Sequence, residues 1–207
     1  MLHVSDLSKS YAGALLFERV SFDLNRGERV ALVGPNGCGK STLLRMIVGT
    51  EPPTAGSVRL GANVHPGYLA QEQDNLDWSA TPLEIARSHA ALSERDARRF
   101  LHQFLFAGDE VFTPVEHLSY GERARLALGV LVLQGRNLLL LDEPINHLDI
   151  PSRERFERAL QGYEGTILAV VHDRYFVQRF ATAIWAIHDQ RLRRYVDLEQ
   201  ARRAAGW

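Results

Sequence analysis

Apolar and polar residues alternate along the first part of the chain. Within residues 2–24, Val20, Phe22 and Leu24 are separated from one another by polar residues, and a turn at residues 11–13 divides the segment in two. A period of two places one face of a strand against a core and the other face in solvent. The pattern therefore predicts two strands at the start of the chain.

Three unbroken apolar runs follow, at residues 30–33, 138–141 and 167–171. Each run is short for a helix, and unbroken runs are typical of strands that are buried on both faces in a parallel sheet. In open α/β sheets, ligands bind at the carboxyl ends of such strands. The residues that directly follow the three runs are therefore candidates for one shared site.

Helical spacing of apolar residues appears after the first run and again from residue 78. Residues 43–48 carry an apolar face that stops at Gly49, and two prolines shortly after it prevent the helix from resuming. Further helical spacing begins at residue 78 and includes an apolar stripe over residues 100–105. We expect a small helical insertion over about residues 78–134.

The last helix of this insertion has a clear start signal. Ser119 and Glu122 form a capping-box pattern in front of a mostly apolar helix, which Gln134 and Gly135 close. A capped helix start with Gly121 in its first turn is either an anion-binding end or a plain cap without a ligand. The segment alone leaves both interpretations open.

Shorter elements complete the expected fold. Residues 56–60 and 68–70 predict two short strands, and residues 183–187 and 192–196 predict a strand pair joined by a turn. A short polar helix is expected at the end of the chain. Together with the buried runs, these elements indicate an α/β protein.

Composition limits the class of protein. The chain has 207 residues, of which 45% are hydrophobic, and a formal charge of −1. It is long enough for one domain over residues 1–207, and it has neither a disordered composition nor the charge of a bulk nucleic-acid binder. The single cysteine excludes a disulfide scaffold and indicates a reducing compartment. Because no apolar run is long enough to span a membrane and no signal-peptide layout is present, we expect a cytoplasmic protein.

The segment after the first buried run fits a phosphate-binding loop. Residues 34–42 read Gly-Pro-Asn-Gly-Cys-Gly-Lys-Ser-Thr, with Gly34, Gly39, Lys40 and Ser41 at the fixed places of G-x-x-x-x-G-K-[ST]. The glycines let backbone N–H groups converge on an anion, and the following helix directs its positive end toward the same point. Lys40 is expected to reach the β- and γ-phosphates of a nucleotide, and the Ser41 hydroxyl is expected to bind Mg²⁺.

Composition supports this interpretation of the loop. Of the 24 basic residues only Lys9 and Lys40 are lysines, so an arginine-rich chain carries the compact ammonium at this position. Cys38 lies inside the loop, and no activated-nucleophile setting is visible around it. We therefore expect Cys38 to contribute its backbone N–H, the alternative being a catalytic thiol.

Candidate chemistry also follows the other two buried runs. Asp142 and Glu143 come directly after the second run, where charges near a core are costly, so an ordinary acidic pair is the weaker interpretation. Asp142 is suited to holding Mg²⁺ through water, and Glu143 to orienting or deprotonating an attacking water. His172 follows the third run at the place of a γ-phosphate contact, although a lone strand-end histidine is usually structural.

Three further features each have two interpretations. Tyr11, on a turn before the phosphate loop, is either a platform for a purine ring or a half-buried strand-end tyrosine. Gln71, at a predicted strand end, is either a ligand of Mg²⁺ or water or a surface glutamine. Five arginines between residues 191 and 203 form either a solvated face or a contact to a phosphate backbone.

Taken in order, these motifs resemble those of an ATP-binding cassette (ABC) domain along nearly the whole chain. The resemblance implies an α/β P-loop NTPase fold with a RecA-like parallel-sheet core, an antiparallel β subdomain and a small α-helical subdomain. The matching motifs are the A-loop aromatic Tyr11, the Walker A loop 34–42, the Q-loop Gln71, the signature 118–122, the Walker B strand 138–143, the D-loop 146–149 and the switch histidine His172.

The resemblance also implies roles for individual residues. Catalysis would fall to Glu143, His172 and Gln71, and Mg²⁺ would be held by Ser41, Gln71 and Asp142. The residues implied to bind ATP are Tyr11, Gly34, Asn36, Gly37, Cys38, Gly39, Lys40, Ser41 and Thr42, together with Ser119 and Gly121 acting on the nucleotide of another cassette.

Details favour one branch of the family. Residues 146–149 (Asn-His-Leu-Asp), residues 172–176 (His-Asp-Arg-Tyr-Phe) and Glu122 resemble ABC-F proteins, which act on ribosomes as translation or antibiotic-protection factors and carry no membrane domain. The part before the signature is also compact, since Gly34 and Ser119 are 119 − 34 = 85 positions apart. The resemblance thus implies a cytoplasmic ATPase with the ribosome or its RNA as a partner, and no insertion into a membrane.

The chain departs from the family pattern in three ways. Tyr120 replaces the first of two signature glycines, and Ile145 stands where the D-loop usually has threonine. ABC-F proteins also resemble two cassettes in one polypeptide, whereas each motif occurs once here. The chain therefore resembles either one cassette of a tandem protein or a free-standing relative that pairs with itself.

The family's architecture implies how such a cassette works. ATP would be sandwiched between the Walker A side of one cassette and the signature of a second, and its hydrolysis would release the pair. The alternatives are the ATPase subunit of a membrane ABC transporter and a non-enzymatic ATP-gated clamp. Slow turnover is expected of the isolated chain, because half of each site would come from a partner.

Overall fold

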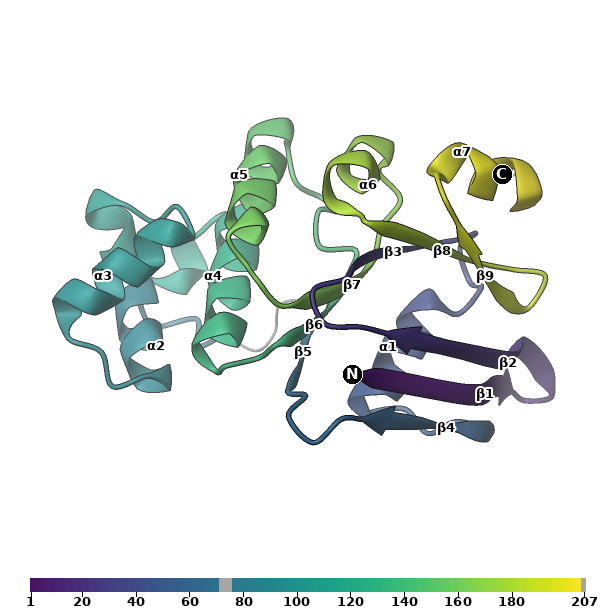
Figure 1. Cartoon of the computed structure of the whole chain (residues 1–207). Helices are drawn as coiled ribbons and strands as arrows, with labels where there is room; N and C mark the ends of the chain where they lie inside the picture. The colour runs from purple at the N-terminus through teal and green to yellow at the C-terminus, as the bar shows by residue number, and fades with distance from the viewer. Residues whose placement is uncertain (71–75, 206–207) are drawn as a thin grey trace. The chain divides into compact units, whose positions relative to one another are not determined.

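The computed structural model of the chain describes residues 1–70 and 76–205 (Figure 1). The described strands are β1 (Leu2–Tyr11), β2 (Ala14–Leu24), β3 (Arg29–Val33), β4 (Ala55–Leu60), β5 (Pro66–Leu69), β6 (Leu138–Asp142), β7 (Thr166–Val170), β8 (Ala183–His188) and β9 (Arg191–Tyr195). The described α-helices are α1 (Lys40–Val48), α2 (Pro82–His89), α3 (Glu94–Gln103), α4 (Tyr120–Leu133), α5 (Ile150–Gln161), α6 (Arg174–Phe180) and α7 (Leu198–Ala205), with 3₁₀ turns η1 (Gly108–Phe112) and η2 (Val115–His117).

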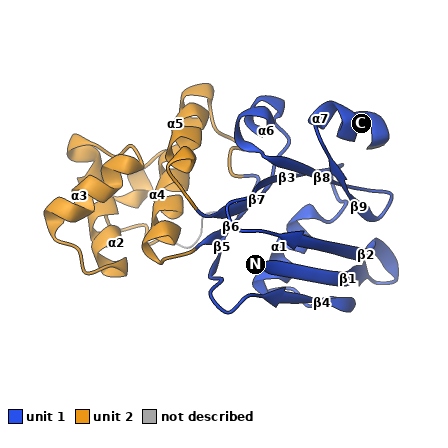
Figure 2. Ribbon diagram, viewed as in Figure 1, with its two compact units in different colours: residues 1–68, 137–143, 165–207 blue, residues 69–136, 144–164 orange. Residues whose placement is uncertain are grey.

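The chain divides into two compact units, coloured separately in Figure 2. The first contains residues 1–68, 137–143 and 165–207, and the second contains residues 69–136 and 144–164. The second unit includes α5, which follows the expected helical insertion in sequence. Both units are discontinuous in sequence because the chain leaves the first unit and returns to it twice.

The three apolar runs form adjacent strands of the first unit. A sheet with the order β5-β6-β7-β3-β8-β9 places β6, β7, β3 and β8 in parallel, and β9 returns antiparallel to β8. Residues 138–141 and 167–170 are completely buried. The prediction of a parallel sheet from unbroken apolar runs is confirmed, and the carboxyl ends of β3, β6 and β7 lie at one edge.

The alternating segment at the start of the chain forms a second, antiparallel sheet with the order β2-β1-β4. Leu2, Val4 and Leu24 are completely buried on one face of it. The ring of Phe22 on β2 packs against that of Trp185 on β8, with 4.6 Å between ring centroids. Apolar residues of this sheet, of the parallel strands and of α1 thus share one core, which holds α1 and the loop before it in place.

The second unit is helical, as expected for the insertion. Its helix α4 begins with the predicted capping box, in which the Ser119 hydroxyl accepts from the N–H of Glu122 and the Glu122 carboxylate accepts from the N–H of Ser119. The helix runs to Leu133, as the predicted closing residues indicate. Among the described residues of either unit, no helix combines the length and apolar character needed to cross a membrane.

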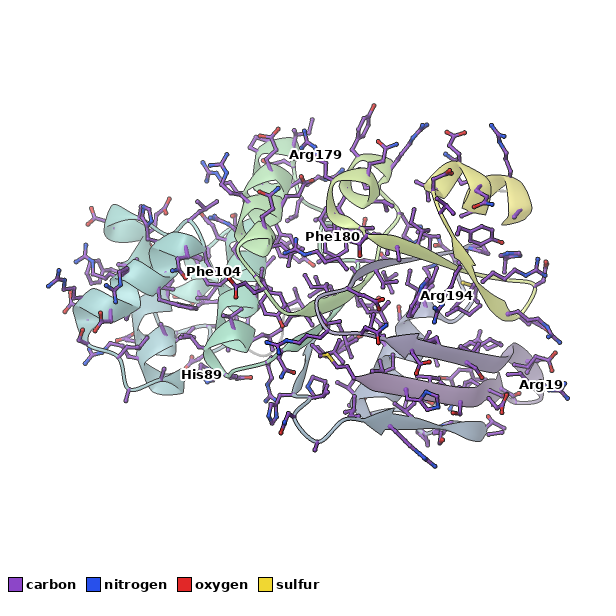
Figure 3. The ribbon with its side chains drawn as sticks, in the orientation of Figure 1. Arg19, His89, Phe104, Arg179, Phe180 and Arg194 are labelled. Carbon is purple, nitrogen blue, oxygen red and sulfur yellow. The ribbon has the colours of Figure 1, made fainter. Side chains whose placement is uncertain are left out.

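The prediction of a helical apolar stripe over residues 100–105 is partly wrong. Helix α3 ends at Gln103, so Phe104 and Leu105 follow the helix, and Leu105 has a left-handed φ of 62°. Phe104, which is labelled in Figure 3, is nevertheless buried. The cause lies in α4, where the guanidinium of the buried Arg125 donates to the carbonyls of Phe104 and Leu105 at 3.1 and 2.9 Å. These bonds satisfy carbonyl groups that a longer helix would have used internally.

The short strand before Gln71 also differs slightly from its prediction. It spans Pro66–Leu69 and pairs with β6, so it begins two residues earlier than expected and ends one residue earlier. Pro66 at its first position is compatible with an edge strand, where no ladder hydrogen bond is lost. Gln71 itself lies outside the described residues.

Candidate functional site

Close contacts surround the two glycines that the phosphate-binding motif requires in the loop between β3 and α1. A Cβ atom at Gly34 would lie 2.6 Å from the carbonyl oxygen of Ile187. A Cβ atom at Gly39, which has a φ of 99°, would lie 2.7 Å from Leu16 Cδ2 and 2.8 Å from Phe17 Cδ1. Glycine is therefore required at both places for steric reasons, and the backbone is left exposed to a ligand.

We expect a matched pair of substitutions to reveal this steric requirement. Gly37 has a φ of 78° but nothing within 4 Å of an added Cβ, so Gly37→Ala should cost only about 1–2 kcal/mol of unfolding free energy from backbone strain. Gly39→Ala adds overpacking against Leu16 and Phe17, so its loss should be larger by about 1–3 kcal/mol. Urea unfolding of the nucleotide-free protein measures both, and equal losses would contradict the packing argument.

Helix α1 begins where the loop ends and has an open N-terminus. Its N-cap is Gly39, which has no side chain to cap the first turn, and its first internal hydrogen bond joins Leu43 N to Gly39 O at 2.8 Å. The N–H groups of the first turn therefore point out of the helix end, where an anion is stabilised by them and by the helix dipole.

Lys40 is held against the loop. Its side chain is almost completely buried, and Nζ donates to the carbonyls of Gly34 and Pro35 at 2.9 Å each. A buried ammonium needs such partners because desolvation of an unpaired charge is costly. The structure thus places the positive charge inside the loop's curve, with its orientation fixed by two backbone groups.

Asp142, at the end of β6, is brought to the same loop. Its Oδ1 accepts a hydrogen bond from the Ser41 hydroxyl at 2.8 Å, and its Oδ2 accepts one from the Tyr68 hydroxyl at 2.8 Å. Burial and the neighbouring carboxylate raise the pKa of Tyr68 above its usual value, so the phenol stays protonated as a donor. The carboxylate is therefore held on both sides.

Tyr68 was not predicted as a residue of the site. The residue was seen only as part of a short strand, and its contact with Asp142 depends on β5 lying beside β6 in the sheet. These two strands are about 70 residues apart in the chain, and no spacing rule connects them. The only available signal was a tyrosine near the end of a strand that precedes Gln71.

Glu143 and His172 meet at the neighbouring strand ends. Glu143 has a left-handed φ of 51°, and its N–H donates to the carbonyl of Val170 on β7 at 3.0 Å. Its Oε1 lies 3.3 Å from Nε2 of His172, which follows β7. A non-glycine residue in this conformation is uncommon, and such strain is often found where a side chain has to be aimed at a site.

Much of the loop, with Tyr11 and Glu143, lines one cavity of about 350 Å³, a volume typical of a small-molecule site. Leu16 and Arg45 also line it and were not predicted. Cys38 is half-buried beside the cavity, and burial raises the pKa of its thiol, which is unfavourable for a reactive thiolate. The lining residues are Tyr11, Leu16, Asn36, Gly37, Gly39, Lys40, Ser41, Thr42, Arg45 and Glu143.

The polar groups near Ser41 fit a magnesium ion. Mg²⁺ prefers oxygen ligands and is usually bound by one or two carboxylates together with substrate phosphates and water. Ser41 supplies a hydroxyl and Asp142 a carboxylate that already contact each other. This donor set suits Mg²⁺ bound jointly with a nucleotide.

In the helical unit, Ser119 and Gly121 lie at the start of α4. Gly121 is packed closely against α5, since an added Cβ would lie 2.8 Å from Cβ of Ser152. The ring of Tyr120 makes an edge contact with that of His147, at 6.1 Å between centroids. Gly121 therefore has a packing reason to be glycine, independent of any ligand.

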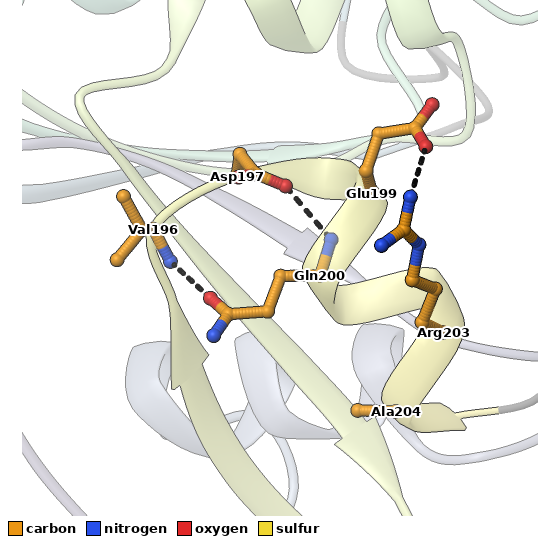
Figure 4. Close-up of a pocket in the computed structure, with 6 residues that line it drawn as sticks. All are labelled: Val196, Asp197, Glu199, Gln200, Arg203 and Ala204. Atoms are coloured by element: carbon orange, nitrogen blue, oxygen red, sulfur yellow. Dashed lines mark hydrogen bonds and ion pairs between the residues drawn. The ribbon is translucent and has the colours of Figure 1, made fainter.

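The arginines near the end of the chain have partners within the protein. Arg191 pairs with Glu18 at 2.9 Å, and Arg194 lies over the ring of Trp185 at 5.1 Å. Arg203 lies 3.8 Å from Glu199 on α7 (Figure 4). These contacts account for much of the cluster without a nucleic acid, which favours the solvated-face interpretation.

Comparisons with known proteins agree with the motifs. The family described as ABC transporter matches residues 17–146. The chain is 48% identical over 198 residues to "Putative ATP-binding protein YdiF" of Bacillus subtilis, 40% identical over 198 residues to "ABC transporter F family member 5" of Arabidopsis thaliana, and 39% identical over 178 residues to "Ribosome protection protein VmlR" of Bacillus subtilis. These alignments cover 95%, 94% and 86% of the chain but only 31%, 29% and 32% of the relatives. The chain thus spans about a third of their length.

A solved structure titled "Structure of ATP binding subunit of ABC transporter" superposes with a TM-score of 0.81 at 26% identity, covering 100% of this chain and 93% of that one. The expected α/β cassette fold, with a parallel-sheet core, an antiparallel sheet and a helical part, is confirmed. The family match covers more than half of the chain and includes the phosphate loop and the Asp142–Glu143 pair. The chain therefore belongs to the ABC transporter family as an ATP-binding cassette domain, and its relatives include F-family proteins.

Proposed function

We propose that this chain is an ATP-binding and ATP-hydrolysing cassette of the ABC-F type that acts, with a second cassette, as a nucleotide-driven switch on the ribosome. The catalytic part of this proposal rests on one observation: two sets of site residues lie together at one edge of the parallel sheet. Lys40, Ser41 and Asp142 lie together at the phosphate loop, and Glu143 contacts His172 beside them.

The chain's own residues would divide the chemistry as follows. The N–H groups of the loop and the ammonium of Lys40 would bind the phosphates and stabilise their charge in the transition state. Glu143 would orient the attacking water and accept its proton, and His172 would hold the γ-phosphate end of the site. Mg²⁺, held by Ser41 and by Asp142, would neutralise charge on the phosphates. Gln71 stays a predicted ligand outside the described residues.

A second cassette would complete the site. Family resemblance assigns Ser119 and Gly121 to the nucleotide of that partner, so one chain would supply the Walker A side of one site and the signature of another. ATP would then join two cassettes, and hydrolysis would release them. The partner would be either a second copy of this chain or another cassette of the same polypeptide.

The comparisons support two candidate settings for this cassette, the ribosome and a membrane transporter. The relative named as a ribosome protection protein supports a ribosomal role in the cytoplasm. The solved structure named as a transporter subunit favours the alternative, an ATPase subunit that couples to a membrane protein. The ribosomal setting is preferred because the relative is more similar, at 39% against 26% identity.

Ribosome sedimentation of the Glu143→Gln variant tests this proposal. With ATP and Mg²⁺ present, the variant should pellet with ribosomes, and it should stay in the supernatant when ADP replaces ATP. If it stays soluble with ATP but is retained by detergent-extracted membrane proteins, the transporter alternative is supported instead.

The rate of ATP hydrolysis per chain of the wild-type protein should rise with protein concentration, because each site would be shared between two cassettes. Fast hydrolysis that does not change on dilution would contradict the shared site.

A further inference from the structure

The chain has two lysines, and the one outside the phosphate loop, Lys9, is also buried. Its side chain, on β1, is 8% exposed. Nζ donates to the carbonyl of Pro52 at 2.8 Å and forms an ion pair with the carboxylate of Glu51. A lysine is rarely buried without a reason, since its charge must be compensated and an apolar residue would fill the space at less cost.

The ammonium of Lys9 also lies over an aromatic ring that faces the cavity. Nζ is 4.7 Å from the ring centroid of Tyr11, within the range of a cation–π contact. Tyr11 is 46% exposed and lines the cavity together with the phosphate loop. One face of the ring is thus in contact with the protein, and a large part of the side chain remains accessible to a ligand.

Glu51 connects the ring and the lysine. Hydrogen bonds from the Lys9 ammonium and from the Tyr11 hydroxyl hold the pKa of the Glu51 carboxyl below its ordinary value. The tyrosine is therefore held at two points, by its hydroxyl through Glu51 and by its ring through Lys9. A compact ammonium can serve a carbonyl, a carboxylate and a ring at once, which the planar fork of an arginine does less readily.

The segment that carries Glu51 is itself fixed to β1. It follows the end of α1 at Gly49, and Thr54 N donates to Ser8 O at 2.9 Å while the Thr54 hydroxyl accepts from Ser10 N at 3.1 Å. Since α1 begins at the phosphate loop, this segment joins the helix that would bind the phosphates to the strand that presents the ring.

We propose that Lys9 and Glu51 are positioning residues that fix the ring of Tyr11 as a stacking platform for the purine base of the nucleotide. This inference rests on the proposed ATP binding and adds the two residues that would hold the base-stacking ring in place. The cation over the ring holds its orientation, and the exposed part of the side chain stays available for stacking on a purine base. Neither Lys9 nor Glu51 is among the residues that line the cavity.

The proposal predicts a selective loss of affinity for ligands that carry a base. Lys9→Met should weaken ATP binding by about three- to tenfold, the range expected for losing an oriented aromatic contact. Binding of inorganic tripolyphosphate with Mg²⁺ should change by less than about twofold, because the phosphate loop is untouched. In a Tyr11→Ala background, Lys9→Met should likewise change ATP affinity by less than about twofold. Isothermal titration calorimetry measures all of these affinities.

The possible negative results distinguish a failure of the proposed ATP binding from a failure of the role proposed for Lys9. If wild-type protein binds neither ATP nor tripolyphosphate, the proposed function itself is wrong. If wild type binds ATP but Lys9→Met weakens ATP and tripolyphosphate equally, or if its effect persists without Tyr11, Lys9 does not act through the ring and the inference is overturned. Should Lys9→Met fail to fold, Glu51→Gln, at a site that is 24% exposed, decides the question by the same comparison of the two ligands.

Discussion

Replacing Glu143 by glutamine is expected to slow ATP hydrolysis by about 10²- to 10⁴-fold, the usual contribution of a positioned general base. Glutamine keeps the shape of the side chain beside His172 but cannot accept a proton from the attacking water. ATP affinity should change little, because the groups of the phosphate loop are unaltered. Single-turnover phosphate release measures the rate, and calorimetry measures the affinity.

The exposed Glu164 offers a matched control for this experiment. Glu164→Gln makes the same chemical change far from the loop in sequence and should leave the rate within about twofold of wild type, as surface substitutions usually do. If Glu143→Gln hydrolyses ATP as fast as wild type does, Glu143 performs no chemistry. In that case the non-enzymatic ATP-gated clamp becomes the better description.

Replacing Lys40 by methionine is expected to weaken ATP binding by roughly 10- to 150-fold, the value of one charge-assisted hydrogen bond. Methionine keeps most of the length of the side chain but has no charge to offer the β- and γ-phosphates. The loss should be larger for ATP than for ADP, because ADP lacks the γ-phosphate. Calorimetry with Mg²⁺ gives both affinities.

A basic residue on the antiparallel sheet serves as the control. Arg59 lies on β4, is exposed and does not line the cavity. Arg59→Met should change ATP affinity by less than about twofold, since exposed charges outside a site are screened by solvent and salt. Equal losses in the two variants would show that general charge attraction, not the position of Lys40, binds the nucleotide. Circular dichroism of Lys40→Met tests whether the loop variant is folded.

The parts of the fold that could be predicted are those with a strong local pattern. Residues 138–141 are completely buried in β6, as an unbroken apolar run indicates. Helix α1 ends at Val48, and Gly49 caps it with the left-handed φ that glycine permits. The prediction failed at Leu105, whose helical spacing continued while the chain left the helix. There, hydrogen bonds from Arg125 on α4 outweighed a local preference, which no periodicity within α3 reveals.

Much of the candidate site could also be placed from sequence, because its groups follow buried strands. Asp142 and Glu143 follow β6 and His172 follows β7, and the sheet brings these strand ends together by its parallel order. Tyr68 and Lys9 were not assigned roles. Their partners, Asp142 and Glu51, are distant in sequence, so the contacts exist only once the two sheets have formed.

The sequence by itself determined the buried parallel strands, the phosphate loop and the family, because each depends on residue types at fixed short spacings that act through local backbone geometry. Only the tertiary structure decided which groups hold the functional side chains. The orientation of Tyr11 depends on Lys9 and Glu51, and that of Asp142 depends on Tyr68. Such contacts depend on strand order and on the path of the chain after α1, and these are settled by how the whole core packs.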